Sequence, residues 1–456
     1  MLFSSMEFLV WFLPCFILIY YLLPNRYKNL CILIFSLVFY MYGCISNPIS
    51  ILLFAGSIVL TFGLGRLIED KKGNGKAWLV LGILIQVGML FLYKYLGFFA
   101  GVFGKQLSIR LLLPLGISFY TFQSLSYLID VYRGTVSAEK SLLRFAVYMG
   151  MFPQVISGPI VRYETVKKQL SHKDITKEGI IKGAELFVLG LGLKAILANR
   201  LSGMWSNIEA IGYQSISTPL AWMGIIAYSL QLYFDFCGYS MMAVGLGKMM
   251  GFKLPNNFNY PYISVTMTEF WRRWHITLGS WFKDYLYIPL GGNRKGVGRT
   301  YLNLLVVWLL TGFWHGASWT FLAWGLFLFL IIANEKLWFG KVLNEHRAMG
   351  HIYMIVLIPL SWMIFAITDI NELLTYAGRL IGIGGVNVFH GDWQKYLSQF
   401  GLFLGAGVLF STRIPRALFE MIKNKYVKGA VLIVLFGASL YMIYKGANDP
   451  FMYFQF

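Results

Sequence analysis

Residues 309–325 read LLTGFWHGASWTFLAWG, a stretch of hydrocarbon-like and aromatic side chains with one ionisable residue, His315. Apolar runs of this kind recur along all 456 residues, and many are long enough to cross a bilayer core of about 30 Å. Hydrophobic residues make up 57% of the chain and charged residues only 13%, whereas a soluble domain carries about a quarter charged residues. The sequence therefore predicts an all-α polytopic membrane protein.

The apolar runs predict about twelve transmembrane helices, with both termini on the extracytoplasmic side. Clusters of Lys and Arg follow the first, third, fifth and ninth runs and precede the last, and such clusters mark cytoplasmic loops. The first run lacks a basic segment and a cleavage site, so we interpret it as a membrane helix rather than a signal peptide. The predicted runs are residues 6–23, 29–45, 49–66, 77–103, 113–131, 179–201, 219–247, 300–317, 318–338, 352–368, 397–411 and 428–444.

The net charge of +19 is explained mainly by those loops. No basic stripe with interleaved aromatic side chains is visible on a soluble face, so the sequence does not predict nucleic-acid binding. The four cysteines lack CxxC spacing, and GxSxG, HExxH and nucleotide-binding motifs are absent from the sequence. We therefore expect no metal site and no standard nucleophile motif. Residues 1–456 are predicted to form a single integral membrane domain.

Two segments interrupt the pattern of simple spans. Residues 145–162, FAVYMGMFPQVISGPIVR, are apolar but contain two prolines and a glycine that break a helix, which predicts a re-entrant hairpin. Residues 255–299 mix Trp, Tyr and Phe with basic residues, which predicts amphipathic helices at the cytoplasmic interface. Within this aromatic–basic element Glu269 and Arg273 are spaced to pair on one helix face.

His315 is the first candidate for chemistry. Polar groups inside a membrane are costly and usually mark a pathway or a reaction site, and histidine exchanges a proton near neutral pH. Gly316 and Ala317 beside it leave room for a substrate or for close helix approach. From the sequence alone, His315 could be a catalytic base or could form a structural hydrogen bond to a neighbouring carbonyl. Asp235, also inside a predicted span, is open in the same way: it could support a ring nitrogen or line an aqueous tunnel, or be a satisfied acceptor.

Several long motifs then resemble one family. These are LPLGISFYTFQSLSYLIDVYRG (113–134), FPQVISGPIVR (152–162), FDFCGYSMMAVGLGKMMGFKLPNNFNYPY (234–262), EFWRRWHITLGSWFKDYLYIPLGGNRKG (269–296) and the stretch around His315. In this order they resemble the membrane-bound O-acyltransferase family, in its bacterial alginate O-acetyltransferase branch. The resemblance is strong over about residues 110–330 and looser at the ends.

The resemblance implies a fold and a set of roles. The fold would be a ring of tilted helices around a thin core with a central tunnel. His315 of the WHG motif would be catalytic, and His275 of the RRWH motif would be the second family histidine. The donor would be acetyl-CoA, with His275 or Trp314 stabilising the oxyanion. Arg272, Arg273, Arg294 and Lys295 would hold the donor's phosphates, unless they only set topology and contact lipid headgroups.

The C-terminal tail, residues 445–456, is predicted to lie outside the cytoplasm. Its end, NDPFMYFQF, resembles the C-terminal motif of the small membrane partner in teichoic acid D-alanylation, whose tyrosine is a proposed acyl carrier. Tyr453 is the matching residue here. An interfacial aromatic anchor is the other reading of this tail.

The expected function is O-acetylation of a polysaccharide outside a bacterial cytoplasmic (inner) membrane. Acetyl would pass from cytoplasmic acetyl-CoA to a secreted or anchored partner resembling an SGNH hydrolase, which would place it on alginate, peptidoglycan, cellulose or another glycan. Two alternatives remain: a membrane transporter or flippase, because broken helices and a buried acid suit transporters too, and a lipid O-acyltransferase that uses a long-chain acyl-CoA.

Overall fold

The computed structural model describes residues 1–70, 74–105, 111–156 and 158–446, and across these ranges the regular structure is helical, without strands. The described chain groups into two compact units. The first contains residues 1–187, 239–256 and 283–285, and the second contains the rest. Both units combine stretches that are far apart in the sequence, and the helices α9 and α11 contribute residues to both.

The first unit is built from helices of the N-terminal half. In chain order they are η1 (Glu7–Phe12), α1 (Leu13–Leu22), α2 (Asn25–Gly43), α3 (Ile49–Glu69), α4 (Gly75–Leu90), η2 (Phe91–Tyr95), α5 (Leu96–Val102), α6 (Ile117–Arg133), α7 (Leu142–Gly150), α8 (Tyr163–Ser171) and most of α9 (Lys177–Gly192). The end of α11 (Thr218–Met249) and the start of η6 (Lys283–Tyr287) complete it.

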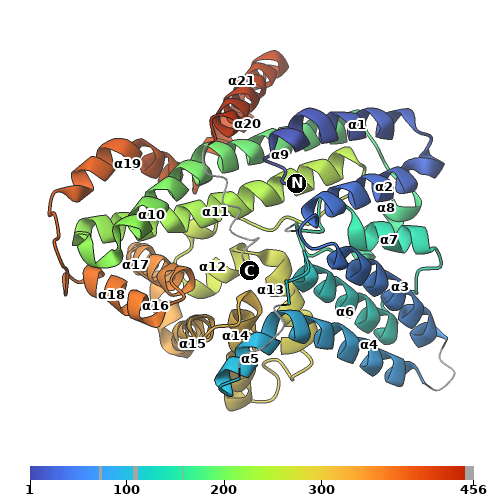
Figure 1. Cartoon of the computed structure of the whole chain (residues 1–456), viewed down its shortest axis with the longest axis horizontal. Coiled ribbons are helices and arrows are strands. Elements are labelled where there is room, and N and C mark those ends of the chain that lie inside the picture. The colour runs from blue at the N-terminus through green and yellow to red at the C-terminus, as the bar shows by residue number, and fades with distance from the viewer. Residues whose placement is uncertain (71–73, 106–110, 157, 447–456) are drawn as a thin grey trace. The chain divides into compact units, whose positions relative to one another are not determined.

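Buried polar side chains join α3, α4 and α6, which lie side by side (Figure 1). Gln86 of α4 donates to Ser57 and to Thr61 of α3 over 3.0 Å each, and Thr61 donates to Ser124 of α6 over 3.2 Å. Such bonds between helices satisfy groups that lipid cannot. Of the 17 residues of α6 most are buried, polar ones included, so this helix is an interior one rather than a lipid-facing one.

The apolar segment 145–162 is interrupted, as the sequence predicted, and does not form one continuous helix. Helix α7 ends at Gly150 and α8 begins at Tyr163, and the described backbone between them is not helical. Phe152 is fully buried among aromatic rings of α1 and α2, and its N–H donates to Ser36 over 3.0 Å. Irregular backbone at membrane depth survives only when protein covers it, and this segment is covered.

Part of the aromatic–basic element belongs to the first unit. Arg162 pairs with Asp284 at 2.7 Å, and the hydroxyl of Tyr285 donates to Asp130 of α6 over 2.7 Å. The guanidinium of Arg162 also lies 5.2 Å from the centre of the Tyr285 ring. These contacts fasten residues 283–285 to α6 and to the chain just before α8.

The second unit contains the predicted catalytic histidines. Its helices are η3 (Leu193–Ala198), α10 (Asn199–Ile211), η4 (Tyr213–Ser215), the first part of α11, η5 (Pro261–Ile263), α12 (Met267–Arg273), α13 (Ile276–Phe282), α14 (Val297–His315), α15 (Trp319–Asn334), η7 (Glu335–Phe339), α16 (Gly340–Glu345), α17 (Arg347–Ala366), α18 (Ile370–Leu380), α19 (Asp392–Phe410), α20 (Ile414–Met421) and α21 (Lys425–Tyr444).

Six helices of the described chain are long and apolar enough to cross a membrane. They are Ile49–Glu69, Gly75–Val102, Thr218–Met249, Trp319–Glu345, Arg347–Ala366 and Lys425–Tyr444, and the bent pair α19–α20 would make a seventh. The predicted runs at 6–23 and 113–131 correspond to shorter or more polar helices. The chain is therefore helical with six or seven clear membrane-spanning candidates, and the count of twelve crossings stays a prediction.

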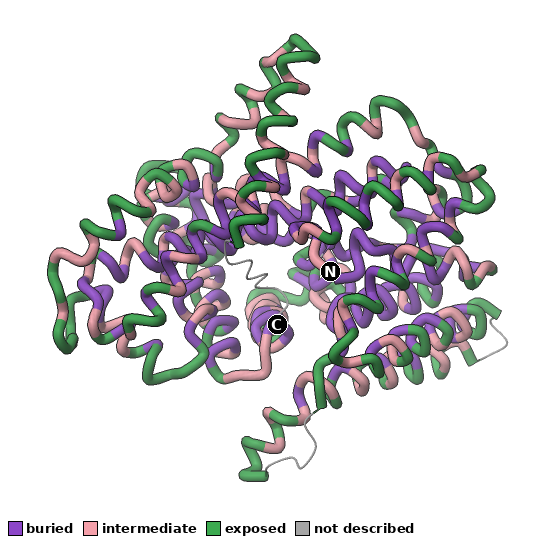
Figure 2. The backbone as a smooth tube through the Cα atoms, turned by 45° about the horizontal axis from the view of Figure 1, so that its top comes forward, coloured by how far each residue is buried: buried purple, intermediate pink, exposed green. Residues whose placement is uncertain are grey.

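Helix α21 differs from the other candidates in its exposure. Only 6% of its most apolar window is buried, against 83% for α11, and Figure 2 shows the contrast between the exposed last helix and the buried centre of the unit. It contacts η3, where Leu435 packs over Gly192. An apolar helix with this much exposed surface is suited to contact lipid.

Two glycines allow α14 and α15 to pack closely. A Cβ on Gly312 would lie 2.2 Å from the carbonyl oxygen of Phe321, and one on Gly325 would lie 2.4 Å from that of Trp308. Small residues at a crossing let helix backbones approach in this way. This close packing joins the helix that ends in His315 to the helix that follows it.

Replacing Gly312 with alanine is expected to lower the free energy of unfolding by about 1–3 kcal/mol, because the added methyl group must push two backbones apart. Gly298→Ala is the matched control, since it changes the same helix where no atom lies within 4 Å of the new Cβ. Thermal unfolding in detergent micelles measures both variants. Equal melting temperatures for the two variants would contradict this account of the crossing.

Candidate active site

His315 is the last residue of α14, and Gly316 and Ala317 separate it from the next helix. Ser318 begins α15 as its N-cap, accepting a hydrogen bond from the N–H of Phe321 over 3.3 Å. The predicted runs 300–317 and 318–338 therefore correspond to α14 and α15, and the break between them falls at His315. The side chain of His315 is only 5% exposed.

Three aromatic rings surround the imidazole of His315. The ring centres of Trp314, Trp324 and Phe365 lie 4.8, 5.3 and 5.2 Å from its own, each roughly perpendicular to it. These rings come from α14, α15 and α17, so three helices fix the orientation of the imidazole. Edge-to-face contacts of this kind are favourable and hold an aromatic ring in one orientation.

Gly316 is required by the packing of the same cluster. A Cβ at this position would lie 2.1 Å from Cε2 of Phe321, so the ring of Phe321 occupies the space that any larger residue would need. Phe321 in turn packs on Phe365, with ring centres 5.1 Å apart. The small residue after the histidine thus serves close packing beside the imidazole.

His275 lies in the bend between α12 and α13, with a backbone φ of 44°. This left-handed conformation is unusual for a residue with a Cβ and costs of order 1–3 kcal/mol, so surrounding contacts must hold it. The side chain is 2% exposed, and its ring packs edge-on against Phe236 of α11, with centres 4.8 Å apart. Strain of this kind is typical of functional sites.

Asn257 determines which nitrogen of His275 carries the proton. Its side-chain oxygen accepts from the N–H of Thr277 over 3.2 Å and lies 3.1 Å from Nδ1 of His275. Because an amide oxygen only accepts, Nδ1 must be the protonated nitrogen. Burial lowers the pKa of His275 to about 3, so the ring is neutral at pH 7 and Nε2 presents a lone pair. A nitrogen with a lone pair cannot donate a hydrogen bond to an oxyanion, whereas the indole N–H of Trp314 can only donate. The protonation of His275 therefore favours Trp314 as the group that stabilises the oxyanion.

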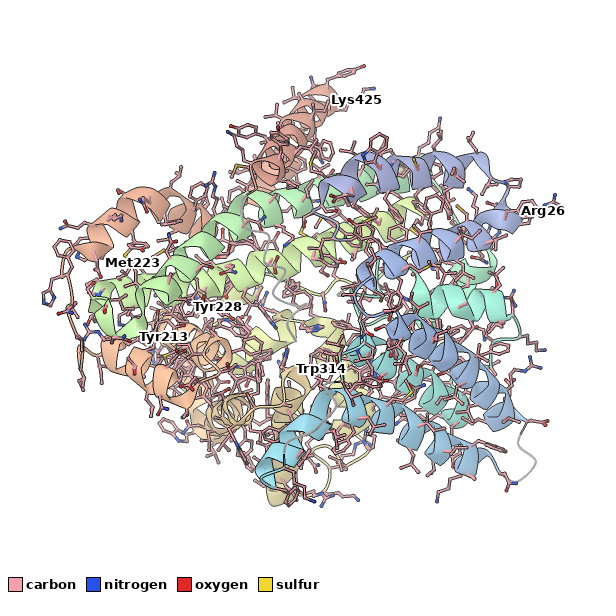
Figure 3. The ribbon with its side chains drawn as sticks, viewed as in Figure 1. Arg26, Tyr213, Met223, Tyr228, Trp314 and Lys425 are labelled. Carbon is pink, nitrogen blue, oxygen red and sulfur yellow. The ribbon has the colours of Figure 1, made fainter. Side chains whose placement is uncertain are left out.

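The two predicted histidines both lie near the ring of Trp314. The ring of Trp314 lies 6.4 Å from His275 and 4.8 Å from His315, centre to centre. Trp314 is labelled in Figure 3 at the end of α14. Residues 40 positions apart in the sequence are therefore brought near the same indole ring within the second unit.

Asp235 forms an ion pair with Lys194 of η3. The side chains are 3% and 0% exposed, so both charges are buried in the second unit. Gly238 and Gly190 allow the contact, because a Cβ on Gly238 would lie 2.6 Å from the carbonyl oxygen of Gly190. Asp235 is thus an acceptor in a buried ion pair with Lys194.

The four predicted phosphate-binding residues separate into two groups. Arg273 is engaged: it pairs with Glu269 at 2.8 Å, as the spacing predicted, and donates to the carbonyl of Asn259 over 3.1 Å. The side chains of Arg272, Arg294 and Lys295 are exposed, and no ion pair joins them to another residue within the described ranges. These three remain available to an anionic ligand.

Other predictions are not addressed by the described residues. Tyr453 lies outside them. Among the residues that are described, no cluster of three His, Cys, Asp or Glu side chains is arranged to hold a metal ion.

Sequence patterns did not single out Asn257 or Lys194. Asn257 stands in an Asn-Asn pair 18 positions before the ring it orients, and Lys194 is the one charged residue between positions 186 and 199. A lone lysine within an apolar run was the available signal for Lys194, since an intramembrane cation needs a partner.

Comparison with known proteins gives a consistent result. The model of the membrane-bound O-acyltransferase family matches residues 135–376, which include both histidines. The chain is 43% identical to the probable alginate O-acetylase of Pseudomonas aeruginosa, over 80% of this chain and 69% of that one. It is 35% identical to the protein of the same name from Pseudomonas putida over the whole of both chains. It is 34% identical to the peptidoglycan O-acetyltransferase of Helicobacter pylori, over 88% and 83% of the two chains. This multi-pass membrane protein belongs to the membrane-bound O-acyltransferase family.

Proposed function

We propose that this acyltransferase moves an acetyl group from cytoplasmic acetyl-CoA across the membrane, with His315 as general base, and that a partner acetyltransferase places the group on a hydroxyl of a polysaccharide outside. One observation supports this most strongly: two buried histidines lie near the same indole, that of Trp314, in a member of a family of O-acyltransferases. The relatives act, by name, on alginate and on peptidoglycan, so a glycan acceptor fits both.

The chemistry needs a base, an oxyanion donor and a leaving group. His315 takes the proton of the attacking hydroxyl as its oxygen forms a bond to the acetyl carbonyl carbon. The N–H of Trp314 is suited to stabilise the oxyanion of the tetrahedral intermediate. The carbon–sulfur bond then breaks, and the thiolate of coenzyme A leaves and accepts the proton from His315. Proton and electron pair therefore balance without a metal or a redox partner.

Donor binding is assigned to Arg272, Arg294 and Lys295, whose exposed side chains suit the phosphates of coenzyme A. Arg273 is assigned a different role, because its guanidinium is bonded to Glu269 and to the chain at Asn259. Within this proposal it fixes the helix that carries the aromatic cluster, and contacts the donor only if those bonds break.

The proposed topology has twelve crossings, with a ring of helices around a thin core and a tunnel that reaches His315 from both sides. Acetyl-CoA does not cross a bilayer and a secreted glycan does not enter the cytoplasm, so the acyl group must pass through the protein. The location is a bacterial inner membrane, with both termini outside. A secreted or anchored SGNH hydrolase-like protein then receives the acetyl group and chooses the polymer.

Tyr453 is proposed as an intermediate carrier of the acetyl group. Tyr453→Phe removes the phenolic oxygen and keeps the ring, so we expect O-acetylation of the exported polymer to be lost while the amount of folded protein stays unchanged. Colorimetric measurement of polymer-bound acetate in a strain that expresses only the variant checks this. Normal acetate content would exclude Tyr453 from the mechanism.

Proteoliposomes test the function itself. Purified protein receives acetyl-CoA labelled in the acetyl group outside, with oligosaccharides of alginate or peptidoglycan and extracytoplasmic proteins of the host sealed inside. The expected result is labelled oligosaccharide in the lumen and free coenzyme A outside. A preference for long-chain acyl-CoA with labelled lipid would indicate the lipid enzyme, and absence of any thioester cleavage would indicate a transporter.

A further inference from the structure

Glu335 is a buried acid within the membrane-spanning candidate Trp319–Glu345. It is the first residue of η7, directly after α15, and only 6% of its surface is exposed. Helix α15 also carries Trp324, whose ring packs on His315. The acid and this part of the histidine's surroundings therefore belong to one continuous helical segment.

Four donors converge on the two oxygens of Glu335. The N–H of Met267 donates to Oε1 over 2.6 Å and the N–H of Thr268 to Oε2 over 2.8 Å. The hydroxyl of Thr268 adds a bond of 2.6 Å to Oε2, and the hydroxyl of Tyr353 a bond of 3.1 Å to Oε1. The two N–H groups are in the first turn of α12, where they have no partner within the helix and where a negative charge is favourable.

The start of α12 is partly capped from within. The side chain of Thr266 accepts from the N–H of Glu269 over 3.1 Å, and Glu269 accepts from the N–H of Val265 over 3.0 Å. These local bonds leave the N–H groups of Met267 and Thr268, which Glu335 accepts from. Glu335 therefore completes the cap and also makes a connection, because its four donors join α12 and, through Tyr353, α17 to the end of α15.

These three helices contribute side chains or chain connections to the surroundings of both histidines. Helix α12 carries Trp271, whose ring centre lies 5.6 Å from that of Trp324, and leads two residues later into His275. Helix α17 supplies Phe365 and α15 supplies Trp324, both in contact with His315. A change in how α12 meets α15 and α17 would therefore shift the two imidazoles relative to each other.

We infer that Glu335 is a positioning residue for acyl transfer: its carboxylate fixes α12 against α15 and α17 and so sets the placement of His275 relative to His315. The inference rests on the proposed function, since it concerns the rate of that reaction. A small displacement of catalytic groups, of about 1 Å, can reduce a rate about 100-fold, so the effect of losing this carboxylate is expected in the chemical step.

Single-turnover kinetics distinguish positioning from stability alone. With enzyme in excess over labelled acetyl-CoA, the rate constant reports the chemical step. A separate active-site titration, with acetyl-CoA in excess over enzyme, gives an amplitude that reports the fraction of folded enzyme. Glu335→Gln keeps the size of the side chain but points an amide N–H₂ at an N–H donor of α12. We expect its rate constant to fall by about 10–100-fold, with the KM for acetyl-CoA within about twofold of wild type.

Glu139→Gln is the matched control. Glu139 of the first unit is also 6% exposed and also accepts from two backbone N–H groups, an arginine and a tyrosine hydroxyl. Its loss is expected to lower the amplitude and the melting temperature but leave the rate constant unchanged.

Thr268→Val is a milder second variant, for use if Glu335→Gln fails to fold. It removes one hydroxyl donor to Glu335, and we expect the rate constant to be about two- to fivefold lower than that of the wild type. In the double variant that combines Thr268→Val with Glu335→Gln, we expect the two effects to be non-additive.

A wild-type rate constant in Glu335→Gln, with only a smaller amplitude, would show that Glu335 is structural and would overturn the inference. So would a wild-type rate constant in Thr268→Val, where Glu335→Gln does not fold. If wild-type protein itself cleaves no acetyl-CoA, the proposed function fails, and this result is distinct from an active wild type with an unaffected variant.

Discussion

His315→Ala is expected to lower the single-turnover rate of acyl transfer by about 10²–10⁴-fold, the range that general acid–base catalysis contributes. Without the imidazole, nothing in the proposed mechanism takes the proton of the attacking hydroxyl. Binding of acetyl-CoA should be unchanged, because the residues assigned to its phosphates lie elsewhere in the sequence. Rapid-quench measurement of labelled acetyl-CoA consumption, with binding measured separately by equilibrium dialysis, checks both expectations.

His172→Ala is the matched control for this variant. His172 has a side chain that is 77% exposed, near Asp174, and its loss should leave the rate within twofold of wild type. The prediction for His315 is contradicted if His315→Ala retains more than about a hundredth of the wild-type rate, since general base catalysis contributes at least about 100-fold.

Asp235→Asn is expected to destabilise the protein by about 3–5 kcal/mol, the cost of leaving one charge of a buried pair without its partner. Lys194 is completely buried, so its ammonium has no access to water once the carboxylate is gone. The double variant Lys194→Met with Asp235→Leu should recover most of that loss, because apolar residues of similar volume often replace a buried pair well. Chemical unfolding in mixed micelles measures all three proteins.

The same variants separate the two readings of Asp235. If the ion pair is structural, the stable double variant transfers acetyl at close to the wild-type rate. If Asp235 lies on a proton route, the double variant is stable but inactive. An Asp235→Asn variant as stable as wild type would contradict the buried pair itself.

The fold class could be predicted from sequence because it depends on composition summed over long windows. The break at His315 could also be predicted, since Gly316 and Ser318 carry local signals for ending one helix and starting the next. Helix α6 is less clear from sequence, because its buried Ser, Thr and Gln side chains lower its hydropathy while other helices cover it. Mean hydropathy over a window identifies a membrane helix reliably only when that helix faces lipid, because a helix buried among other helices can carry polar side chains.

The arrangement around the histidines could be predicted only in part. The family motifs indicated His275 and His315, but the contacts that orient them join residues far apart in the chain. Asn257 and His275 are 18 positions apart, Lys194 and Asp235 are 41 apart, and Glu335 and Thr268 are 67 apart. No local pattern encodes such pairs, because each depends on how two helices pack. The left-handed backbone of His275 is likewise a result of its surroundings.

Sidedness of transfer tests the central claim most directly. Inside-out and right-side-out membrane vesicles that contain the protein receive labelled acetyl-CoA outside, and label on hydroxyl acceptors across the membrane is counted. The account predicts label in the lumen of inside-out vesicles only, and none when His315 is replaced by Gln. Label that appears equally in both orientations, or that crosses the membrane in His315→Gln, would contradict it.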